Sequence, residues 1–583
     1  MKHAWAVALA LASVLLARGT AGADVVWVRF ADHGDLEHAP AAQCRAAARA
    51  TISARALERR ARRGAAEPFA NDLPVEPRYV SALTSRGFQV RVVSRWLNAA
   101  SVEAAPERLA ELAGLPFVSR IEPVERSRAD SDLERATTEV VRAAAPRPAS
   151  AAAAAAAGLD QPGDAAFYGA SAAQNALIES DRLHARGLSG AGILVTMIDT
   201  GFRETHEVFD SLQVVARRDF VHGDTVVANE AGQDDAGQDY HGTETLSVVG
   251  AYEPGVLVGT AFRATFALAK VEVVTSETPV EMDWWQAAAE WADSLGADVI
   301  SSSLGYTTFD APFPSYTYDD MDGRTTVVTR AAGEAARRGI VVVTAQGNEG
   351  LTPWRYLIAP ADADTVCAVG ATDSTGRVAF FSSYGPSADG RVKPDVCAMG
   401  VSTTLASPAS DVNLTLASGT SFSTPAVAGV AAMLLEAHPE WSPFDVLQAL
   451  RATASQFAAP DTHFGYGLAR AEAALAWTPS TVFAETVPGA AALVMVGPLP
   501  VMSGRSIAFW ARAGTADGPA SLGVFDARGR KVRELFAGSL RAGSERLFSW
   551  DGSDGGGARA RAGVYFIRFE APGVHLGRRL VLL

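Results

Sequence analysis

Residues 418–425 read Ser418-Gly419-Thr420-Ser421-Phe422-Ser423-Thr424-Pro425, and an apolar run from Ala426 to Leu435 follows them. Apolar side chains recur in this run at helical spacing, which predicts a buried helix. Pro425 suits the first turn of that helix, where a backbone N–H would have no partner. Ser421 is therefore expected near the positive end of a helix dipole. Such a place favours the oxyanion that forms when a serine attacks a carbonyl.

Three further motifs supply the partners that a serine nucleophile needs. Asp199 ends an apolar run over 193–198, and the carboxyl ends of parallel strands carry the sites of open α/β sheets. His241 opens a second helical pattern. Asn348 follows the apolar strand 340–344 and can donate a hydrogen bond to an oxyanion without titrating. Each residue alone also has a plain structural interpretation as a cap or turn former.

These motifs together resemble the subtilisin-like serine peptidases, or subtilases. The resemblance rests on Asp199-Thr200-Gly201, His241-Gly242-Thr243, Gly347-Asn348 and Gly419-Thr420-Ser421, with support from Phe381-Ser382-Ser383-Tyr384-Gly385-Pro386 and Lys393-Pro394-Asp395-Val396. It covers about residues 165–477. Several separate motifs in the same order make a far more specific signal than any one of them. The expected fold is α/β, with a doubly wound parallel sheet.

The resemblance also implies roles for individual residues. Asp199, His241 and Ser421 would form the catalytic triad, with Asn348 in the oxyanion hole. The substrate-binding residues would be Ser303, Leu304, Gly305, Gln346 and Gly347. His206 is the nearest rival base, but it lacks the Gly-Thr that follows His241. No metal ligand is assigned.

Three positions depart from the family pattern. Glu244 stands where the family often has a histidine, which brings a second acid near His241. Gln346 replaces a common small residue beside the substrate pocket, so the preferred P1 residue is not carried over. Phe422 replaces a frequent methionine after the nucleophile, which predicts activity that tolerates peroxide.

The segment before the peptidase-like region carries three predicted parts. Residues 1–23 are predicted to be a secretory signal peptide, since an apolar stretch is followed by Ala21-Gly22-Ala23. Residues 24–125 are predicted to be an inhibitory propeptide that occupies the cleft, with a small α+β domain of unrelated role as the alternative. Residues 126–163, rich in alanine and proline, are a predicted linker in which autoprocessing could cut.

Short strands and turns replace helices after the peptidase-like region of residues 164–478. Residues 479–583 are a predicted β-sandwich. The pattern Trp550-Asp551-Gly552 followed by Ala562-Gly563-Val564-Tyr565 resembles the FlgD-like immunoglobulin-fold and sorting-type domains of exported bacterial proteins. That resemblance implies secretion or surface attachment, and a stabilising appendage is the alternative.

Composition limits the remaining function classes. The net charge is −14, from 65 acids against 51 bases, which argues against nucleic-acid binding. Three cysteines are too few for a disulfide framework, and whether Cys367 and Cys397 pair is left open. No cofactor is required for the predicted chemistry. A structural calcium ion, for example in the acidic loop 306–326, remains open.

The sequence as a whole predicts a secreted bacterial serine endopeptidase made as an autoprocessed zymogen. Its partners would be protein and peptide substrates and its own propeptide, with no nucleic acid and no membrane span after signal cleavage. The main alternative is a degenerate subtilase that acts as a surface binding or adhesion module. An esterase on another serine fold is disfavoured, because no Gly-x-Ser-x-Gly motif follows a strand.

Overall fold

The computed structural model describes residues 24–65, 70–123, 143–145, 162–311, 313–478, 492–496, 507–514, 516–526, 528–541, 544–561 and 563–582. The chain divides into two compact units, Met1–Trp477 and Thr478–Leu583. The predicted signal peptide lies outside the described residues. Within the described residues, no helix has the length and apolar character needed to cross a membrane.

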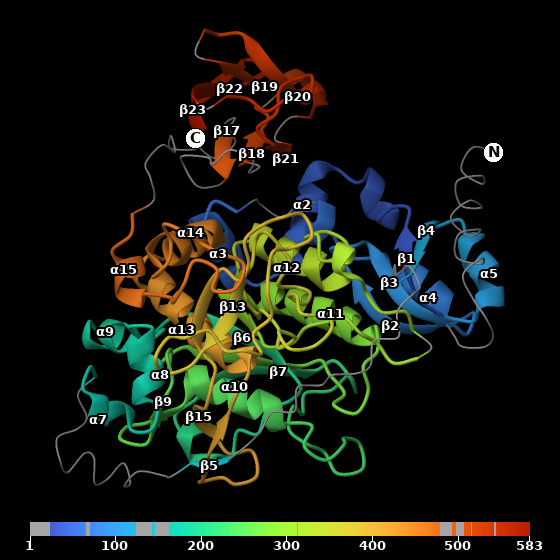
Figure 1. Ribbon diagram of the computed structural model, residues 1–583. Helices are drawn as coiled ribbons and strands as arrows, with labels where there is room; N and C mark the ends of the chain where they lie inside the picture. Colours follow the sequence, from blue (N-terminus) through green and yellow to red (C-terminus); the bar gives the residue numbers. More distant parts are fainter. Residues whose placement is uncertain are drawn as a thin grey trace. The chain divides into compact units, whose positions relative to one another are not determined.

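A seven-stranded sheet forms the centre of the first unit, and all of its strand pairs are parallel (Figure 1). The order is β14-β13-β12-β11-β6-β10-β7. The strands are β6 (Leu194–Asp199), β7 (Gln213–Asp219), β10 (Thr265–Lys270), β11 (Val299–Ser302), β12 (Val341–Ala345), β13 (Cys367–Thr372) and β14 (Val396–Met399). The predicted parallel α/β sheet is confirmed.

Helices cover both faces of this sheet, as its nearly continuous apolar strands require. Alternate residues of one strand face opposite cores, so Val341 and Val343 lie in one cluster and Val342 in the other. The first cluster includes side chains of α10 (Tyr240–Gly250), α13 (Thr420–Ala437) and α14 (Pro443–Thr453). The second includes side chains of α11 (Val280–Leu295) and α12 (Val327–Arg337).

The place of Pro425 corrects the sequence analysis. Helix α13 begins at Thr420 with Gly419 as its N-cap, so Pro425 lies inside the helix and not in its first turn. A proline there removes the N–H that would bond the carbonyl of Ser421. That carbonyl instead accepts a hydrogen bond of 2.8 Å from Ser303 Oγ. The carbonyl that Pro425 leaves without a helical donor thus has a partner outside the helix. Helix α13 begins before Pro425, with Ser421 in its first turn.

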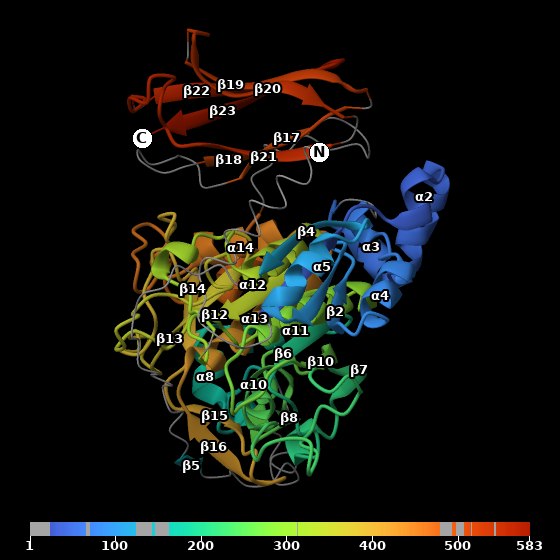
Figure 2. The ribbon, with the colours of Figure 1, turned by 90° about the vertical axis from the view of Figure 1, so that its right-hand side faces the viewer.

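Residues 24–123 form a smaller α+β layer beside α11 (Figure 2). Its antiparallel sheet has the order β2-β3-β1-β4, with β1 (Asp24–Phe30), β2 (Gln89–Ser94), β3 (Ala99–Ala104) and β4 (Val118–Pro123). Its helices are η1 (Gly34–His38), α2 (Ala41–Ala50), α3 (Ala54–Arg62), η2 (Ala70–Asp72), α4 (Pro77–Thr84), η3 (Pro106–Arg108) and α5 (Leu109–Ala113).

Part of the predicted linker belongs to a sheet. Strand β5 (Ala143–Ala145) pairs antiparallel with β16 (Leu414–Ala417), which pairs with β15 (Thr403–Ala406). The remaining short elements of the first unit are α7 (Ala165–Tyr168), α8 (Ala172–Leu177), α9 (Ser180–Ala185), η4 (Glu207–Phe209), β8 (Tyr252–Glu253), β9 (Leu257–Val258), η5 (Tyr318–Asp320) and α15 (Ala471–Leu475).

The second unit contains two antiparallel sheets around one core. One has the order β17-β18-β21 and the other β20-β19-β22-β23. The strands are β17 (Ala492–Val496), β18 (Ile507–Arg512), β19 (Gly518–Asp526), β20 (Lys531–Leu540), β21 (Glu545–Trp550), β22 (Gly563–Ala571) and β23 (Val574–Leu582). Phe509 and Trp550 from the first sheet share a core with Leu522 and Phe569 from the second. The predicted strand-rich region is confirmed, and its type stays a prediction.

The three cysteines are free, and Cys367 and Cys397 are buried in adjacent strands. Burial raises the pKa of both thiols, which keeps them in the unreactive protonated form.

Candidate active site

The carboxylate of Asp199 is held by donors on both of its oxygens. Asp199 is the last residue of β6 and is 1% exposed. Its Oδ1 lies 2.7 Å from His241 Nδ1 and accepts a 2.8 Å bond from the Thr200 N–H. Its Oδ2 accepts a 2.9 Å bond from Thr245 Oγ1. The imidazole is thereby oriented through Nδ1, and Nε2 is the ring nitrogen that would take a proton from a nucleophile.

Two glycines allow His241 to approach the end of β6. A Cβ on Gly242 would lie 1.9 Å from the carbonyl oxygen of Gly201, so any side chain there would push the helix away. Thr245 is one helical turn after His241 and faces the same carboxylate, as the spacing of four predicts. The sequence analysis missed Thr245, although its position relative to His241 carried the signal.

Ser421 lies at the start of α13 and is 6% exposed. Its Oγ donates a long bond of 3.5 Å to the carbonyl oxygen of Ser303. Its two neighbours in sequence contact the other candidate residues. The ring of Phe422 is 6.1 Å from that of His241, and the N–H of Thr420 donates to Asn348 Oδ1 at 2.8 Å. In the first turn of α13, the two residues that flank Ser421 thus contact the base and the amide.

The side-chain amide of Asn348 has a fixed orientation. Its Oδ1 accepts from both the backbone N–H and the Oγ1 of Thr420, at 2.8 and 3.0 Å. The same hydroxyl accepts a 3.2 Å bond from the N–H of Gly347. Because Oδ1 is held as an acceptor, Nδ2 is the end of the amide that would donate to a substrate oxygen.

The five expected substrate-binding residues lie on two adjacent strand ends. Ser303, Leu304 and Gly305 follow β11, while Gln346 and Gly347 follow β12, its parallel neighbour. Leu304 is 9% exposed. Gln346 is fully buried, and both polar atoms of its side chain lack a hydrogen-bond partner among the described residues. The side chain of Gln346 therefore lies in the protein interior, directly after the end of β12.

The rival base His206 has a structural role. Its Nδ1 accepts from the N–H of Val208 at 3.2 Å, so Nε2 carries the proton that bonds the carbonyl of Asn413 at 2.8 Å. The ring is fully buried. Glu244 is also fully buried, within α10 and one turn beyond His241.

Three glutamates gather close to Asp199. Ligand oxygens of Glu272, Glu277 and Glu281 lie within 4.8 Å of one another. Burial, and the charges of Glu281 and Glu277, raise the pKa of Glu272 well above its usual range; burial and Glu277 raise that of Glu281 to about 8. Tyr306 donates its hydroxyl proton to Glu272. The raised pKa values favour the protonated, neutral form of Glu272 and Glu281.

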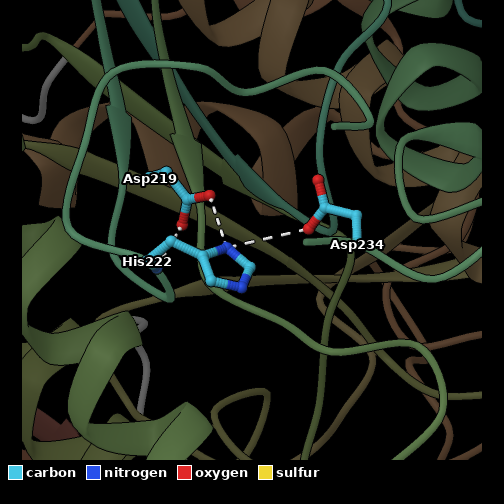
Figure 3. Close-up of side chains that lie close together, drawn as sticks. All are labelled: Asp219, His222 and Asp234. Atoms are coloured by element: carbon cyan, nitrogen blue, oxygen red, sulfur yellow. Dashed lines mark hydrogen bonds and ion pairs between the residues drawn. The ribbon is translucent and has the colours of Figure 1, made fainter. Parts of the chain in front are cut away.

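A second acidic cluster contains Asp219, His222 and Asp234 (Figure 3). His222 Nδ1 lies 3.1 Å from Asp219 and 3.7 Å from Asp234. The buried ammonium of Lys270 bonds both carboxylates, at 2.9 Å to Asp219. Calcium prefers oxygen ligands, so a histidine nitrogen and a resident lysine charge do not fit it.

Two carboxylates of the acidic loop 306–326 form hydrogen bonds within their own turns, and a calcium ion in this loop stays a prediction. Asp320 accepts from the N–H and hydroxyl of Thr317, both at 2.8 Å, and so caps η5. Asp322 accepts from the N–H groups of Arg324 and Thr325 at 2.8 Å. These carboxylates serve as turn caps.

Comparisons with known proteins match two parts of the chain. The Subtilase family model matches residues 190–467, and the model of the Peptidase S8 propeptide domain of Bacteroidota matches residues 25–139. Subtilisin DY from Bacillus licheniformis is 34% identical over 301 residues, which are 51% of this chain and 96% of that protein. Subtilisin Savinase from Lederbergia lenta is 32% identical over 300 residues, with the same two shares.

A solved structure resembles most of the chain. Fervidolysin from Fervidobacterium pennivorans, described as a keratinolytic enzyme related to subtilisin, aligns with a TM-score of 0.52. The alignment covers 94% of this chain and 70% of that one, at 18% identity. At this identity, the likeness concerns the fold alone.

Proposed function

The chain belongs to the subtilase family of serine peptidases, and from this premise we propose that it is a secreted endopeptidase with an Asp199–His241–Ser421 triad. The observation that carries the proposal is the 2.7 Å contact between Asp199 and His241, next to the turn that presents Ser421. Asp199 would hold the imidazole in one tautomer and stabilise its charged form.

In the proposed reaction, Ser421 Oγ attacks the carbonyl carbon of the scissile peptide bond. The hydroxyl proton passes to His241 Nε2, and the carbonyl oxygen becomes an oxyanion. When the C–N bond breaks, His241 returns that proton to the leaving amine and an acyl-enzyme remains. Water then repeats the sequence and releases the acid product and free Ser421.

We assign oxyanion stabilisation to Asn348 Nδ2 and the backbone N–H of Ser421. Thr420 orients the Asn348 amide, and the first turn of α13 carries the N–H of Ser421. Donors fixed in advance are effective because they need no rearrangement as the charge develops.

We further propose that residues 24–125 are an inhibitory propeptide and that Ser421 removes it from its own chain. The match of residues 25–139 to a propeptide domain supports this zymogen arrangement. Export is proposed from the sequence pattern of residues 1–23. Surface attachment through the second unit stays a separate hypothesis.

A comparison of intact masses after secretion tests the proposal. The wild-type chain should lose the region before about residue 165, and Ser421→Ala should keep it. Equal trimming of both chains would assign processing to another protease, and no trimming of either would favour a binding module.

A second pair of measurements separates the enzyme classes. A fluorophosphonate probe should label the wild type and not Ser421→Ala. Hydrolysis of casein in preference to a short-chain ester would identify a peptidase, and the reverse preference would identify an esterase.

A further inference from the structure

Helix α3, in the proposed propeptide, carries three arginines that are almost completely buried. Arg59 and Arg60 are each 2% exposed, and Arg63, just after the helix end, is 6% exposed. Buried guanidinium groups are costly unless every charge and N–H has a partner. Nearly all of these partners belong to the peptidase part of the chain.

Arg59 reaches three acceptors beyond residue 290. It donates to the carbonyl oxygens of Ala297 at 2.6 Å and Arg338 at 3.2 Å, and it pairs with Asp293. Asp293 is itself fully buried in α11. Its pKa is lowered despite its burial, because Arg59 and Arg60 surround its carboxylate together with Arg338 and Arg95.

The neighbouring arginines extend this contact. Arg60 pairs with Asp293 at 2.7 Å and with Asp72 of its own domain through two bonds of 2.8 and 3.0 Å. Arg63 pairs with Asp298 at 2.7 Å and donates to the carbonyl of Gly339 at 2.7 Å. Arg55 also pairs with Asp298 and donates to the carbonyls of Gly296 and Gly192 at 3.1 and 2.8 Å.

Several of the acceptor carbonyls belong to residues that follow the end of a helix. Gly296 follows the end of α11, and Arg338 and Gly339 follow the end of α12. Helix ends leave carbonyls without partners and carry the negative end of the dipole, which favours cations. Gly296 has φ +90°, and a Cβ there would lie 2.7 Å from the backbone nitrogen of Ala56. Helix α3 therefore packs directly on this turn.

This contact lies at the edge of the sheet where strands begin. Strand β11 starts at Val299 and β12 at Val341, directly after the turns that the arginines bind. Asp199, Ser303 and Asn348 lie at or just beyond the other ends of their strands. The arginines of α3 therefore bind the edge opposite to the candidate active site.

A second contact joins the same two parts of the chain. Ser94 bonds Glu290 and Ser101 bonds Asp283, both on α11. Trp27 and Trp96 share a buried cluster with Trp285. The two contacts meet at Asp293 of α11, because Arg95, directly after β2, pairs with the same carboxylate at 2.8 Å.

We propose that α3 is an arginine anchor, formed by Arg55, Arg59, Arg60 and Arg63, that keeps the N-terminal domain bound at the edge opposite to the cleft after the chain is cut. The anchor supplies guanidinium groups, and the surface that it binds consists of Asp293, Asp298 and the carbonyls of the residues that follow α11 and α12. This inference rests on the proposed function, since it takes residues 24–125 to be a removable propeptide. Dissociation at this edge then limits how fast peptidase activity emerges.

The test uses the full chain with its native serine, processed during secretion. The processed complex is diluted, and the emergence of activity on a chromogenic peptide is followed over time. Arg59→Met should speed this emergence at least about tenfold, because charge-assisted bonds to buried partners govern dissociation. The matched control is Arg62→Met, on the same helix but exposed. The final kcat/KM should be equal in all three proteins.

If peptidase activity appears at the same rate in Arg59→Met and Arg62→Met, the proposed arginine anchor is wrong. If Arg59→Met is not secreted in folded form, the same substitution is placed in the uncut Ser421→Ala chain. Amide hydrogen exchange at 296–298 and 339–340 should then rise in Arg59→Met and not in Arg62→Met, and unchanged exchange would also overturn the anchor. A wild type that never labels with fluorophosphonate would refute the proposed function, while the exchange result still decides the anchor.

Discussion

Ser303 Oγ donates a 2.8 Å hydrogen bond to the carbonyl oxygen of Ser421, the carbonyl that Pro425 leaves without its helical donor. The two serines are 118 residues apart and also meet through a 3.5 Å bond from Ser421 Oγ to the carbonyl of Ser303. The end of β11 and the start of α13 are thereby joined. Because Pro425 has no N–H, the carbonyl of Ser421 can accept the bond from Ser303, and this bond holds the backbone of the candidate nucleophile.

Ser303→Ala should lower the free energy of unfolding by about 1–3 kcal/mol, because it leaves a buried carbonyl without a donor. The measurement is denaturant unfolding in the Ser421→Ala background, which avoids self-digestion. Pro425→Ala returns an N–H to the same carbonyl. The double variant Ser303→Ala/Pro425→Ala should therefore lose less stability than the two single changes predict. Additive losses would mean that the two residues do not share this carbonyl.

Asn348→Ala should lower kcat by about 10²–10³ with little change in KM, since the lost donor acts on the oxyanion rather than on bound substrate. Steady-state kinetics on a peptide substrate measures both constants. Thr420→Val should cause a smaller loss of kcat, because Asn348 keeps its bond from the Thr420 N–H. A change confined to KM in Asn348→Ala would contradict the assignment.

Retention of the N-terminal domain should weaken as pH rises from about 4 to about 7. Burial raises the pKa of Asp283 to about 7 in the docked chain, where Ser101 donates to it and Arg91 lies near it. Domain release would return this carboxyl to its ordinary pKa near 4. The docked form thus holds a proton that the released form loses, so the contribution of Asp283 to docking is largest below pH 4 and levels off above pH 7.

The rate of activity emergence at pH 5, 6, 7 and 8 measures this dependence. Burial also raises the pKa of Glu290, which acts in the same direction. The lowered pKa of Asp293 acts in the opposite direction, but only below pH 4. Asp283→Asn should flatten the profile between pH 5 and 7, and an unchanged slope would exclude Asp283 as its source.

The wild type should keep its activity in dilute peroxide, and Phe422→Met should lose it. Phe422 is fully buried beside His241, and a methionine at this position can become a polar sulfoxide. Residual activity after timed exposure is the measurement, with circular dichroism to show that the fold is kept. Equal loss in both proteins would indicate damage elsewhere, for example at other methionines.

The sequence by itself determined the parallel sheet and the candidate site residues. Strands such as β6 and β12 are continuous apolar runs, and the polar residues that follow them lie at the carboxyl edge by the rules of the fold. Motifs of this kind are local in sequence. Periodicity and turn chemistry therefore suffice to find them.

Only the tertiary structure decided which residues from distant segments of the chain form hydrogen bonds and ion pairs with one another. In the sequence, Pro425 is typical of a helix start. In the structure α13 begins earlier, and Ser303 donates the hydrogen bond that the carbonyl of Ser421 lacks within the helix. Asp219 and Asp234 have the chemistry of cation ligands, but in the structure Lys270 forms an ion pair with both carboxylates. In the sequence, the arginines of α3 are typical of a solvated charge run. In the structure Arg59 and Arg63 are buried, and they bond Asp293 and the carbonyl of Gly339. Each contact joins separated segments, and burial and pairing depend on the folded chain rather than on local pattern.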